Sequence, residues 1–414
     1  MRLLVVHQNF PGQFRHVVLA AIARGDEVLA IGRDTAPGLD GVRLFRYRTG
    51  RKTPANIHPY LIRYEQAVID GQKVFTILTR LKQTSYRPDV VLAHPGWGET
   101  LFVKDVFPDT PLVHYCEYYY RAHGADSGFD PEFARAESES SRLRVLNSMH
   151  LLNLEQCDIA IAPTHWQRSL FLQAYRSRIK VIHEGVVQNS SVAQVESVVL
   201  PCGAELKAGQ PIVTYVARNL EPYRGFHSFM RAIPQIQAAC PSARIVIVGG
   251  DEVSYGRRPA EYANWRCRML AEVKFDHSRV HFTGKLAYQT YRAILQLSTV
   301  HVYLTYPFVL SWSLLEAMAS GCVVVASDTA PVMEVIQDGV NGLLVDFFDC
   351  QAIAERVSKV LNSCGEYNPL QAAAKRTASK FDVTAGTKQY FELFENATSG
   401  PNGKRAAVRF GAGI

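Results

Sequence analysis

The sequence has no long apolar run and no ordered arrangement of cysteines. No stretch approaches the roughly 18 apolar residues that span a bilayer, and the opening Leu3–Val6 is too short for the core of a signal peptide. The eight cysteines form no C-x-x-C pair and have no histidine clustered near a pair, so neither a disulfide framework nor a zinc site is indicated. We therefore expect a cytoplasmic protein with reduced thiols.

Three other motifs are missing, and each absence excludes a type of ligand site. No G-x-G-x-x-G follows the first apolar strand, where only Gly12 is available, which argues against a dinucleotide oxidoreductase. No D-x-D pair is present to hold a divalent ion against a diphosphate, so no metal is expected. No recognised nucleic-acid motif accompanies the basic residues, and we expect no DNA or RNA partner.

The composition that remains is typical of a globular chain with more than one core. The chain has 414 residues, of which 47% are apolar and 20% charged, and a domain takes about 150 residues. Its net charge of +7 is uneven along the chain. Residues 1–87 carry 14 Lys and Arg against 6 Asp and Glu, residues 88–199 carry 9 against 14, and residues 200–414 carry 22 against 18.

The densest basic stretch lies in the first of these segments. It is either a solvated charged surface or a face that meets anionic headgroups or an acidic acceptor. In the second case the protein would sit peripherally at the inner membrane face. The stretch contains Arg43, Arg46, Arg48, Arg51 and Lys52.

Short apolar strands alternate with helical patterns in two series. Such alternation predicts parallel sheets covered by helices on both faces, the doubly wound α/β arrangement. The first series has strands at Leu3–His7, Val28–Ile31, Val90–Ala93, Leu112–Tyr115, Ile159–Ala162 and Val181–Ile182. The second has strands at Ile212–Val216, Ile245–Val248, Val280–Phe282, Val300–Leu304, Val323–Ala326 and Leu343–Val345.

Five segments follow from this pattern. We expect two Rossmann-like domains facing each other across a cleft, because ligands bind outside the carboxyl ends of parallel strands. The predicted segments are an N-terminal domain over 1–190, a linker over 191–210, a C-terminal domain over 211–384, a helix over 385–398 and a loose tail over 399–414.

A candidate anion site lies at the start of a predicted helix, which begins between about Ser311 and Ser313. The free N–H groups of a first helical turn attract phosphate. Glu316 lies three residues after Ser313, so its carboxylate either closes a capping box on the Ser313 N–H or accepts hydrogen bonds from a ribose diol. Both alternatives remain open at this point.

Two arginines follow a buried strand of the second series. Arg218 stands at the end of the strand and Arg224 six residues later, just before a predicted helix at Phe226–Ala239. Two guanidiniums at such an edge suit a diphosphate, although salt bridges with acids such as Glu221 are the simpler alternative.

The first domain offers an acceptor side. Gly12 and Gln13 open its first helix and can present N–H groups to a phosphate, or form a simple tight turn. His94, Trp97 and Glu99 follow a predicted strand, where Trp97 can stack on a sugar. Glu117 follows the next strand and is a similar candidate, whereas the acidic segment Asp126–Glu132 receives no role.

Several motifs together resemble those of retaining family-4 glycosyltransferases of the GT-B fold. They are VARNLEPYRG, IVIVGGD, HFTGKL, SLLEAMASGCVVVASD and DGVNGLLV, with the opening HQNFPGQF, and the resemblance covers about residues 1–375. It implies that Arg218 and Arg224 neutralise a donor diphosphate, that Glu316 holds the ribose, and that His94 belongs to the catalytic centre. It also implies that the backbone at Ser313, Leu314 and Leu315 cradles phosphate and that Gly249, Gly250 and Lys285 lie near the base.

The resemblance has two departures. The family's E-x(7)-E pair requires a glutamate where this chain has Phe308, and the usual lysine after the first arginine is replaced by Arg224 at a longer spacing. An arginine keeps the charge but not the reach of a lysine.

The resemblance implies hexose transfer from a UDP- or GDP-linked sugar, with no cofactor and with retention of configuration. The acceptor would be a hydroxyl of a sugar, a lipid-linked glycan or a small aglycone. A sugar-nucleotide epimerase of GT-B-like fold and a non-catalytic nucleotide-binding protein are the alternatives.

Overall fold

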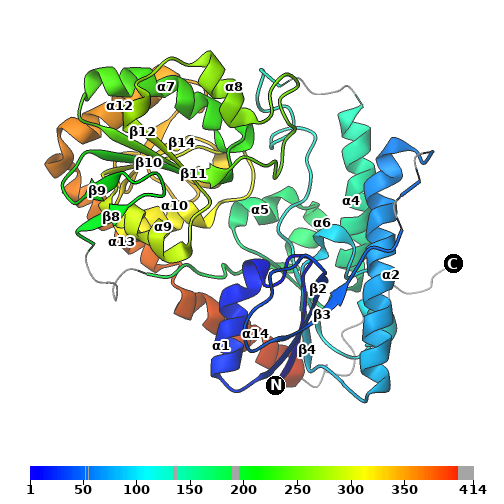
Figure 1. Ribbon diagram of the computed structural model, residues 1–414. Coiled ribbons are helices and arrows are strands. Elements are labelled where there is room, and N and C mark those ends of the chain that lie inside the picture. The colour runs from blue at the N-terminus through cyan, green and yellow to red at the C-terminus, as the bar shows by residue number, and fades with distance from the viewer. Residues whose placement is uncertain (52, 55, 134–137, 189–194, 400–414) are drawn as a thin grey trace. The chain divides into compact units, whose positions relative to one another are not determined.

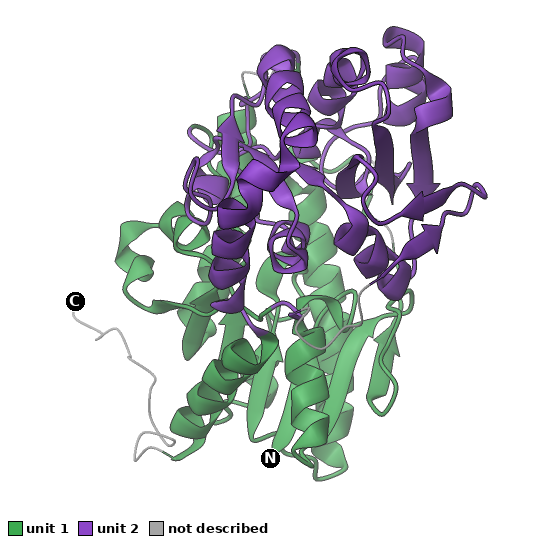
Figure 2. Ribbon diagram, turned by 90° about the vertical axis from the view of Figure 1, so that its left-hand side faces the viewer, with its two compact units in different colours: residues 1–123, 133–185, 383–414 green, residues 124–132, 186–382 purple. Residues whose placement is uncertain are grey.

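The computed structural model describes the chain apart from residues 52, 55, 134–137, 189–194 and 400–414 (Figure 1). The chain forms two compact units (Figure 2). Unit 1 comprises Met1–His123, Phe133–Gly185 and Val383–Ile414, and unit 2 comprises Gly124–Glu132 and Val186–Asp382.

Unit 1 contains a seven-stranded sheet in which every pairing is parallel. The order reverses between β1 and β4, which makes this point the topological switch of the sheet. In sheet order the strands are β3 (Arg43–Tyr47), β2 (Glu27–Arg33), β1 (Arg2–Val6), β4 (Val90–Ala93), β5 (Leu112–Tyr115), β6 (Ile159–Ala162) and β7 (Ile179–Val181).

Helices cover both faces of this sheet. The last helix, α14, returns to unit 1, where Tyr390 and Phe394 are fully buried in the same core as Phe14 and Val17. The helices of unit 1 are α1 (Arg15–Ala23), α2 (Ile62–Gln83), α3 (Val103–Val106), α4 (Glu139–Gln156), α5 (His165–Leu170), α6 (Gln173–Arg176) and α14 (Val383–Ser399), with short 3-10 turns η1 (Gly12–Phe14), η2 (Pro59–Leu61) and η3 (Pro95–Trp97).

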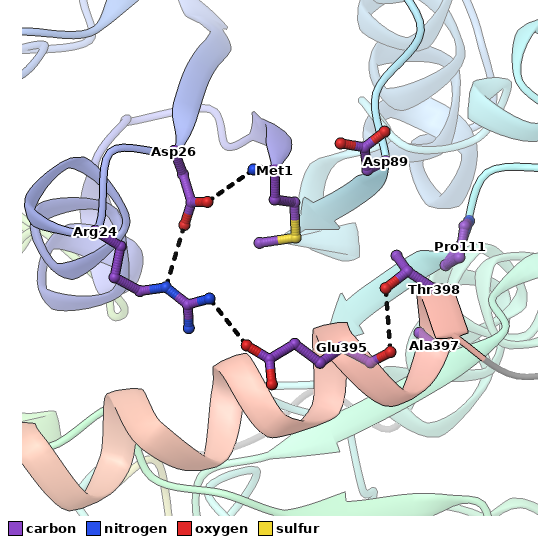
Figure 3. A pocket seen from close by; sticks show the side chains of 8 residues that line it. All are labelled: Met1, Arg24, Asp26, Asp89, Pro111, Glu395, Ala397 and Thr398. Atoms are coloured by element: carbon purple, nitrogen blue, oxygen red, sulfur yellow. Dashed lines mark hydrogen bonds and ion pairs between the residues drawn. The ribbon is translucent and has the colours of Figure 1, made fainter.

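Charged groups fasten α14 at the amino edge of the sheet (Figure 3). The Met1 amine lies 2.8 Å from Asp26 Oδ1, and Arg24 reaches both Asp26, at 3.5 Å, and Glu395, at 2.9 Å. These side chains line a pocket. Its charges are already paired, Asp89 with Arg2 at 2.8 Å and the others with one another. The pocket lies at the edge opposite the carboxyl ends of the strands, so we assign it a structural role.

Unit 2 repeats the arrangement with six parallel strands. Its switch point lies between β10 and β13. In sheet order the strands are β12 (Val280–Gly284), β11 (Arg244–Gly250), β10 (Ile212–Asn219), β13 (Val300–Tyr303), β14 (Val323–Ser327) and β15 (Leu343–Val345). The helices are α7 (Phe226–Ala239), α8 (Trp265–Glu272), α9 (Tyr288–Leu297), α10 (Trp312–Ser320), α11 (Ala330–Met333), α12 (Cys350–Asn362) and α13 (Asn368–Ser379), with 3-10 turns η4 (Pro222–Arg224), η5 (His277–Arg279) and η6 (Cys364–Tyr367).

The expected linker over 191–210 differs from the structure. Residues 191–194 lie outside the described part, and the rest holds a two-stranded antiparallel sheet of β8 (Ser197–Val199) and β9 (Glu205–Lys207). Leu200 and Leu206 are buried against unit 2 and anchor this hairpin. The valines and leucines of this stretch show no sustained period, so the pattern is too weak to predict strands. The loose tail expected over 399–414 is also outside the described residues, except for Ser399 at the end of α14.

The acidic segment Gly124–Glu132, here named the crossing segment, belongs to unit 2. Asp130 Oδ2 accepts a hydrogen bond from the Tyr306 hydroxyl at 2.6 Å and lies 3.0 Å from His227 Nε2. The Asp130 and His227 side chains are each 2% exposed. Burial favours the neutral acid, but the His227 and Tyr306 hydrogen bonds outweigh it and hold the pKa of Asp130 below its usual value.

The two ends of the crossing segment are fixed as well. The Tyr223 hydroxyl donates to Asp126 Oδ2 at 2.9 Å, and Glu132 pairs with Arg231 at 2.8 Å and with Arg268 at 2.5 Å. The chain therefore enters unit 2, is held there by three acids, and returns to unit 1. No role could be predicted for these acids, because their partners lie at least 97 residues away in the sequence.

We predict that Asp130→Ala destabilises the protein by about 3 kcal/mol, because the change leaves the buried His227 and Tyr306 groups without their acceptor. The urea unfolding midpoint measures this change. Asp109→Ala removes an exposed aspartate and is the matched control. Equal midpoints for the two variants would contradict the anchoring role of Asp130.

Candidate functional site

In unit 1 two histidines begin loops at the same point of the sheet. Val6 of β1 pairs in register with Ala93 of β4, and the His94 N–H donates to the Val6 carbonyl at 3.0 Å. His7 and His94 therefore leave adjacent strands side by side at the topological switch. Doubly wound sheets bind ligands at this position.

Backbone hydrogen bonds select the tautomer of both rings. His7 Nδ1 accepts from the Asn9 N–H at 3.0 Å, and His94 Nδ1 accepts from the Gly96 N–H at 3.1 Å. A nitrogen that accepts carries no hydrogen, so each neutral ring has its hydrogen on Nε2. Both Nε2–H groups are thus donors.

The two histidines meet at Glu117. His94 Nε2 donates to Glu117 Oε2 at 3.2 Å, while His7 Nε2 donates to Gln13 Oε1 at 2.8 Å and Gln13 Nε2 donates on to Glu117 Oε1 at 2.6 Å. Burial acts to raise the pKa of Glu117, but the His94 and Gln13 hydrogen bonds outweigh it and lower the pKa. The result is an ionised carboxylate whose side chain is 25% exposed.

Glycines make room for both imidazoles. A Cβ on Gly12, which has φ of +49°, would lie 2.3 Å from His7 Cε1, and a Cβ on Gly96 would lie 2.6 Å from His94 Cε1. The half-buried Trp97 stacks on His94 with ring centroids 4.2 Å apart and planes at 19°. The predicted residues Gly12, Gln13, His94, Trp97 and Glu117 therefore form one group, to which the structure adds His7.

Glu99 lies apart from this group. It is 1% exposed, and its Oε1 accepts from the Tyr47 hydroxyl of β3 at 2.5 Å. Burial raises the pKa of Glu99. In this position the side chain ties the loop after β4 to the neighbouring part of the sheet.

In unit 2 the two predicted arginines differ. Arg218 is exposed, with no side-chain partner among the residues that the structure describes, and it lies where the register between β10 and β11 shifts. Arg224 is buried, and its Nη1 donates at 2.9 Å to both Thr305 Oγ1 and the Val309 carbonyl. Arg218 is available to an anion, whereas Arg224 holds the loop after β13.

Phe308 fills the position where the resemblance predicts a glutamate. Its ring centroid lies 4.8 Å from that of Tyr255 and 5.5 Å from that of Tyr223, and the Arg224 guanidinium lies 5.8 Å from it. The position is thus part of an aromatic group beside a buried cation and carries no carboxylate.

The capping-box alternative for Glu316 is wrong. Helix α10 begins at Trp312 with Ser311 as its N-cap, and the Ser313 N–H donates to Ser311 Oγ at 3.4 Å. Because the helix begins earlier than the capping box requires, Glu316 lies beyond its first turn. Its oxygens instead accept from the Tyr288 hydroxyl at 2.7 Å and the Tyr291 hydroxyl at 2.8 Å.

The other predicted donor residues lie at the same carboxyl edge. Ser313 is 6% exposed, and Leu314 and Leu315 are fully buried, so their side chains belong to the core while their N–H groups begin α10.

Gly249 and Gly250 end β11. A Cβ on Gly250 would lie 2.3 Å from Glu252 Oε2 and 2.6 Å from Lys285 Cε. Lys285 pairs with Glu252 at 2.9 Å, and both side chains are exposed.

The described part of the chain has neither a metal cluster nor a membrane-spanning helix. It contains no group of three or more His, Cys, Asp or Glu side chains placed to hold a metal ion. None of its helices combines the length and apolar character needed to cross a bilayer. All eight cysteines are free thiols.

Three residues of these two groups were not predicted from the sequence. His7 could have been found from its position after the first apolar strand, which matches that of His94. Tyr288 and Tyr291 begin α9, and only the packing of α9 on α10 brings them to Glu316.

We predict that Gly12→Ala disrupts the His7, Gln13 and Glu117 hydrogen bonds, because the new Cβ would overlap the His7 ring. The variant should lose catalytic turnover by about tenfold or more, since misplaced site groups are costly. Gly25→Ala is the control, because Gly25 also has positive φ, +81°, but nothing within 4 Å of its Cβ position. Initial rates and thermal midpoints for both variants test this, and equal rates would contradict the role of the glycine.

Comparisons with known proteins agree with this architecture. Residues 24–190 match the family described as "Glycosyl transferase family 4 group", and residues 210–363 match "Glycosyl transferases group 1". The chain is 24% identical over 321 residues to D-inositol 3-phosphate glycosyltransferase of Nocardioides sp., covering 74% of this chain and 64% of that one. It is 23% identical over 282 residues to phosphatidyl-myo-inositol mannosyltransferase of Mycolicibacterium smegmatis, covering 61% and 69%.

Two solved structures share the fold. Anabaena Alr3699/HepE in complex with UDP-glucose has a TM-score of 0.67 at 19% identity, covering 96% of this chain and all of that one. Sucrose-phosphate synthase from Thermosynechococcus elongatus has a TM-score of 0.68 at 18% identity, covering 96% and 98%. With the two family matches, which together span more than half of the residues, these findings show that the chain belongs to glycosyltransferase family 4 and has the GT-B fold.

Proposed function

We propose that the protein transfers a hexose from a nucleoside-diphosphate sugar to a hydroxyl acceptor, with retention of anomeric configuration. The observation that carries this proposal is Arg218, an exposed cation without a protein partner among the described residues, at the carboxyl end of β10. Its strand pairs with β13, which leads into the loop before α10. A free guanidinium and a helix N-terminus then share one edge of the sheet, where a diphosphate can bind.

The chemistry follows from charge. The leaving diphosphate gains negative charge as the bond to the sugar breaks, so fixed positive groups stabilise the transition state more than the ground state. Arg218 would contact the diphosphate directly. The buried Arg224 would hold the loop after β13 in place and add positive charge near the diphosphate. The N–H groups at Ser313, Leu314 and Leu315 would contribute the dipole of α10.

The rest of the donor would lie along the same edge. In the proposed complex Glu316 accepts the ribose hydroxyls, and the backbone at Gly249 and Gly250, with Lys285, borders the base. A UDP- or GDP-linked hexose fits this proposal, since one structural neighbour is described with UDP-glucose and one relative is called a mannosyltransferase. The nucleotide-sugar is a co-substrate, and no cofactor is required.

Unit 1 would bind the acceptor. The ionised Glu117 can accept hydroxyl hydrogen bonds, the Nε2–H of His94 lies beside it, and Trp97 offers an aromatic face to a sugar ring. Gly12 and Gln13 belong to the same group. A sugar, a lipid-linked glycan or a small aglycone would satisfy these contacts.

We also propose that the protein is cytoplasmic and contacts the inner face of an anionic membrane peripherally. Lys52 lies outside the described residues, and Arg46 is engaged with backbone carbonyls. The Arg48 and Arg51 side chains are 86% and 64% exposed, and they pair with Asp34 at 3.0 Å and Glu65 at 2.5 Å, respectively. Exposed Leu61 and Ile62 nearby in sequence supply apolar contacts.

We predict that Arg218→Ala weakens binding of the best nucleotide in a UDP, GDP and ADP panel by about 10- to 100-fold, because a charged hydrogen bond contributes about 1.5–3 kcal/mol. Arg376→Ala removes a similarly exposed arginine of unit 2, on α13, and is the control. Calorimetric titration measures both. If Arg218→Ala bound the nucleotide with wild-type affinity, the diphosphate would not bind at this site.

A further inference from the structure

The carboxylate of Glu316 is held in a defined plane by two tyrosines. It is 5% exposed, and each of its oxygens accepts one hydroxyl, from Tyr288 on Oε1 and from Tyr291 on Oε2. The terminal torsion of a glutamate is otherwise broad. Two donors on opposite oxygens restrict that rotation and leave one acceptor position on each oxygen.

The two tyrosines differ in their surroundings. Tyr291 is 9% exposed and joins the core that packs α9 on α10, whereas Tyr288 is 49% exposed. Tyr288 is therefore the tyrosine at the surface through which a ligand would approach the carboxylate. A ligand hydroxyl bound to Oε1 would lie beside the Tyr288 hydroxyl.

A buried arginine orients the Tyr288 hydroxyl. Arg292 Nη1 donates to the Tyr288 oxygen at 3.0 Å and to the Val187 carbonyl at 2.8 Å. Since the Tyr288 oxygen accepts from Arg292, its own hydrogen is directed to Glu316. Desolvation of the partly buried Tyr288 hydroxyl raises its pKa to about 12, with Glu316 adding to the effect, so the hydroxyl keeps its hydrogen at neutral pH.

We propose that Tyr288 is a positioning residue for nucleotide recognition, which sets the Glu316 carboxylate to accept the vicinal hydroxyls of a ribose. This inference rests on the proposed function and extends it to a residue outside the motifs. The two remaining acceptor positions of Glu316 lie in one fixed plane and match the two hydroxyls of a diol, which donate. A carboxylate that rotated freely would have to be ordered when the ligand binds, which costs entropy.

The test uses the full-length protein, with UDP and 2′,3′-dideoxy-UDP as probes in calorimetric titrations. Tyr288→Phe removes only the hydroxyl and should weaken UDP binding about tenfold, which corresponds to about 1.4 kcal/mol. Its affinity for the dideoxy probe should stay within about twofold of the wild type. In a Glu316→Gln background the same change should lose most of its effect, because the two residues act through one interaction.

Tyr262→Phe, at an exposed tyrosine of unit 2, is the matched control and should bind UDP as the wild type does. Unchanged UDP affinity in Tyr288→Phe, or an equal loss for both probes, would overturn the inference. A lower thermal midpoint with unchanged affinity would likewise make Tyr288 merely structural. If the wild type bound none of UDP, GDP and ADP, the proposed function would fall together with the inference.

Discussion

Parallel strand pairing is the constraint on which both candidate groups depend. In each unit the order of strands reverses once, between β1 and β4 and between β10 and β13. The in-register pairing of Val6 with Ala93 makes His7 and His94 neighbours, and the pairing of Tyr215 with Val302 brings the ends of β10 and β13 to one edge. Residues far apart in sequence become adjacent because hydrogen-bonded strands end together.

The protein uses wholly or partly buried acids to place other groups. Glu117 accepts hydrogen bonds from a histidine and a glutamine, and Glu316 accepts them from two tyrosines. Asp130 fixes the crossing segment in unit 2. A buried carboxylate is costly unless its oxygens are satisfied. Each of these acids meets that need with hydrogen-bond donors, which also fix its position.

Much of the fold could be predicted because buried parallel strands are nearly continuous apolar runs. Where the pattern is mixed, prediction fails for identifiable reasons. The strand at Arg43–Tyr47 mixes charged and apolar residues without a regular period at a sheet edge. The buried face of α4 includes Asn147, His150 and Asn153, which interrupt the apolar period. Among site residues, those directly after strands could be named from the sequence, whereas the burial of Arg224 and the tyrosines at Glu316 depend on packing between elements.

The proposed donor site places a pyrophosphate group at the carboxyl edge of unit 2, between Arg218 and the start of α10. A crystal structure of the protein with its preferred nucleotide-sugar tests this most directly. We expect phosphate oxygens within hydrogen-bond distance of the Arg218 guanidinium and of N–H groups in the first turn of α10. Phosphates bound at another edge of the sheet, with Arg218 still in solvent, would contradict it.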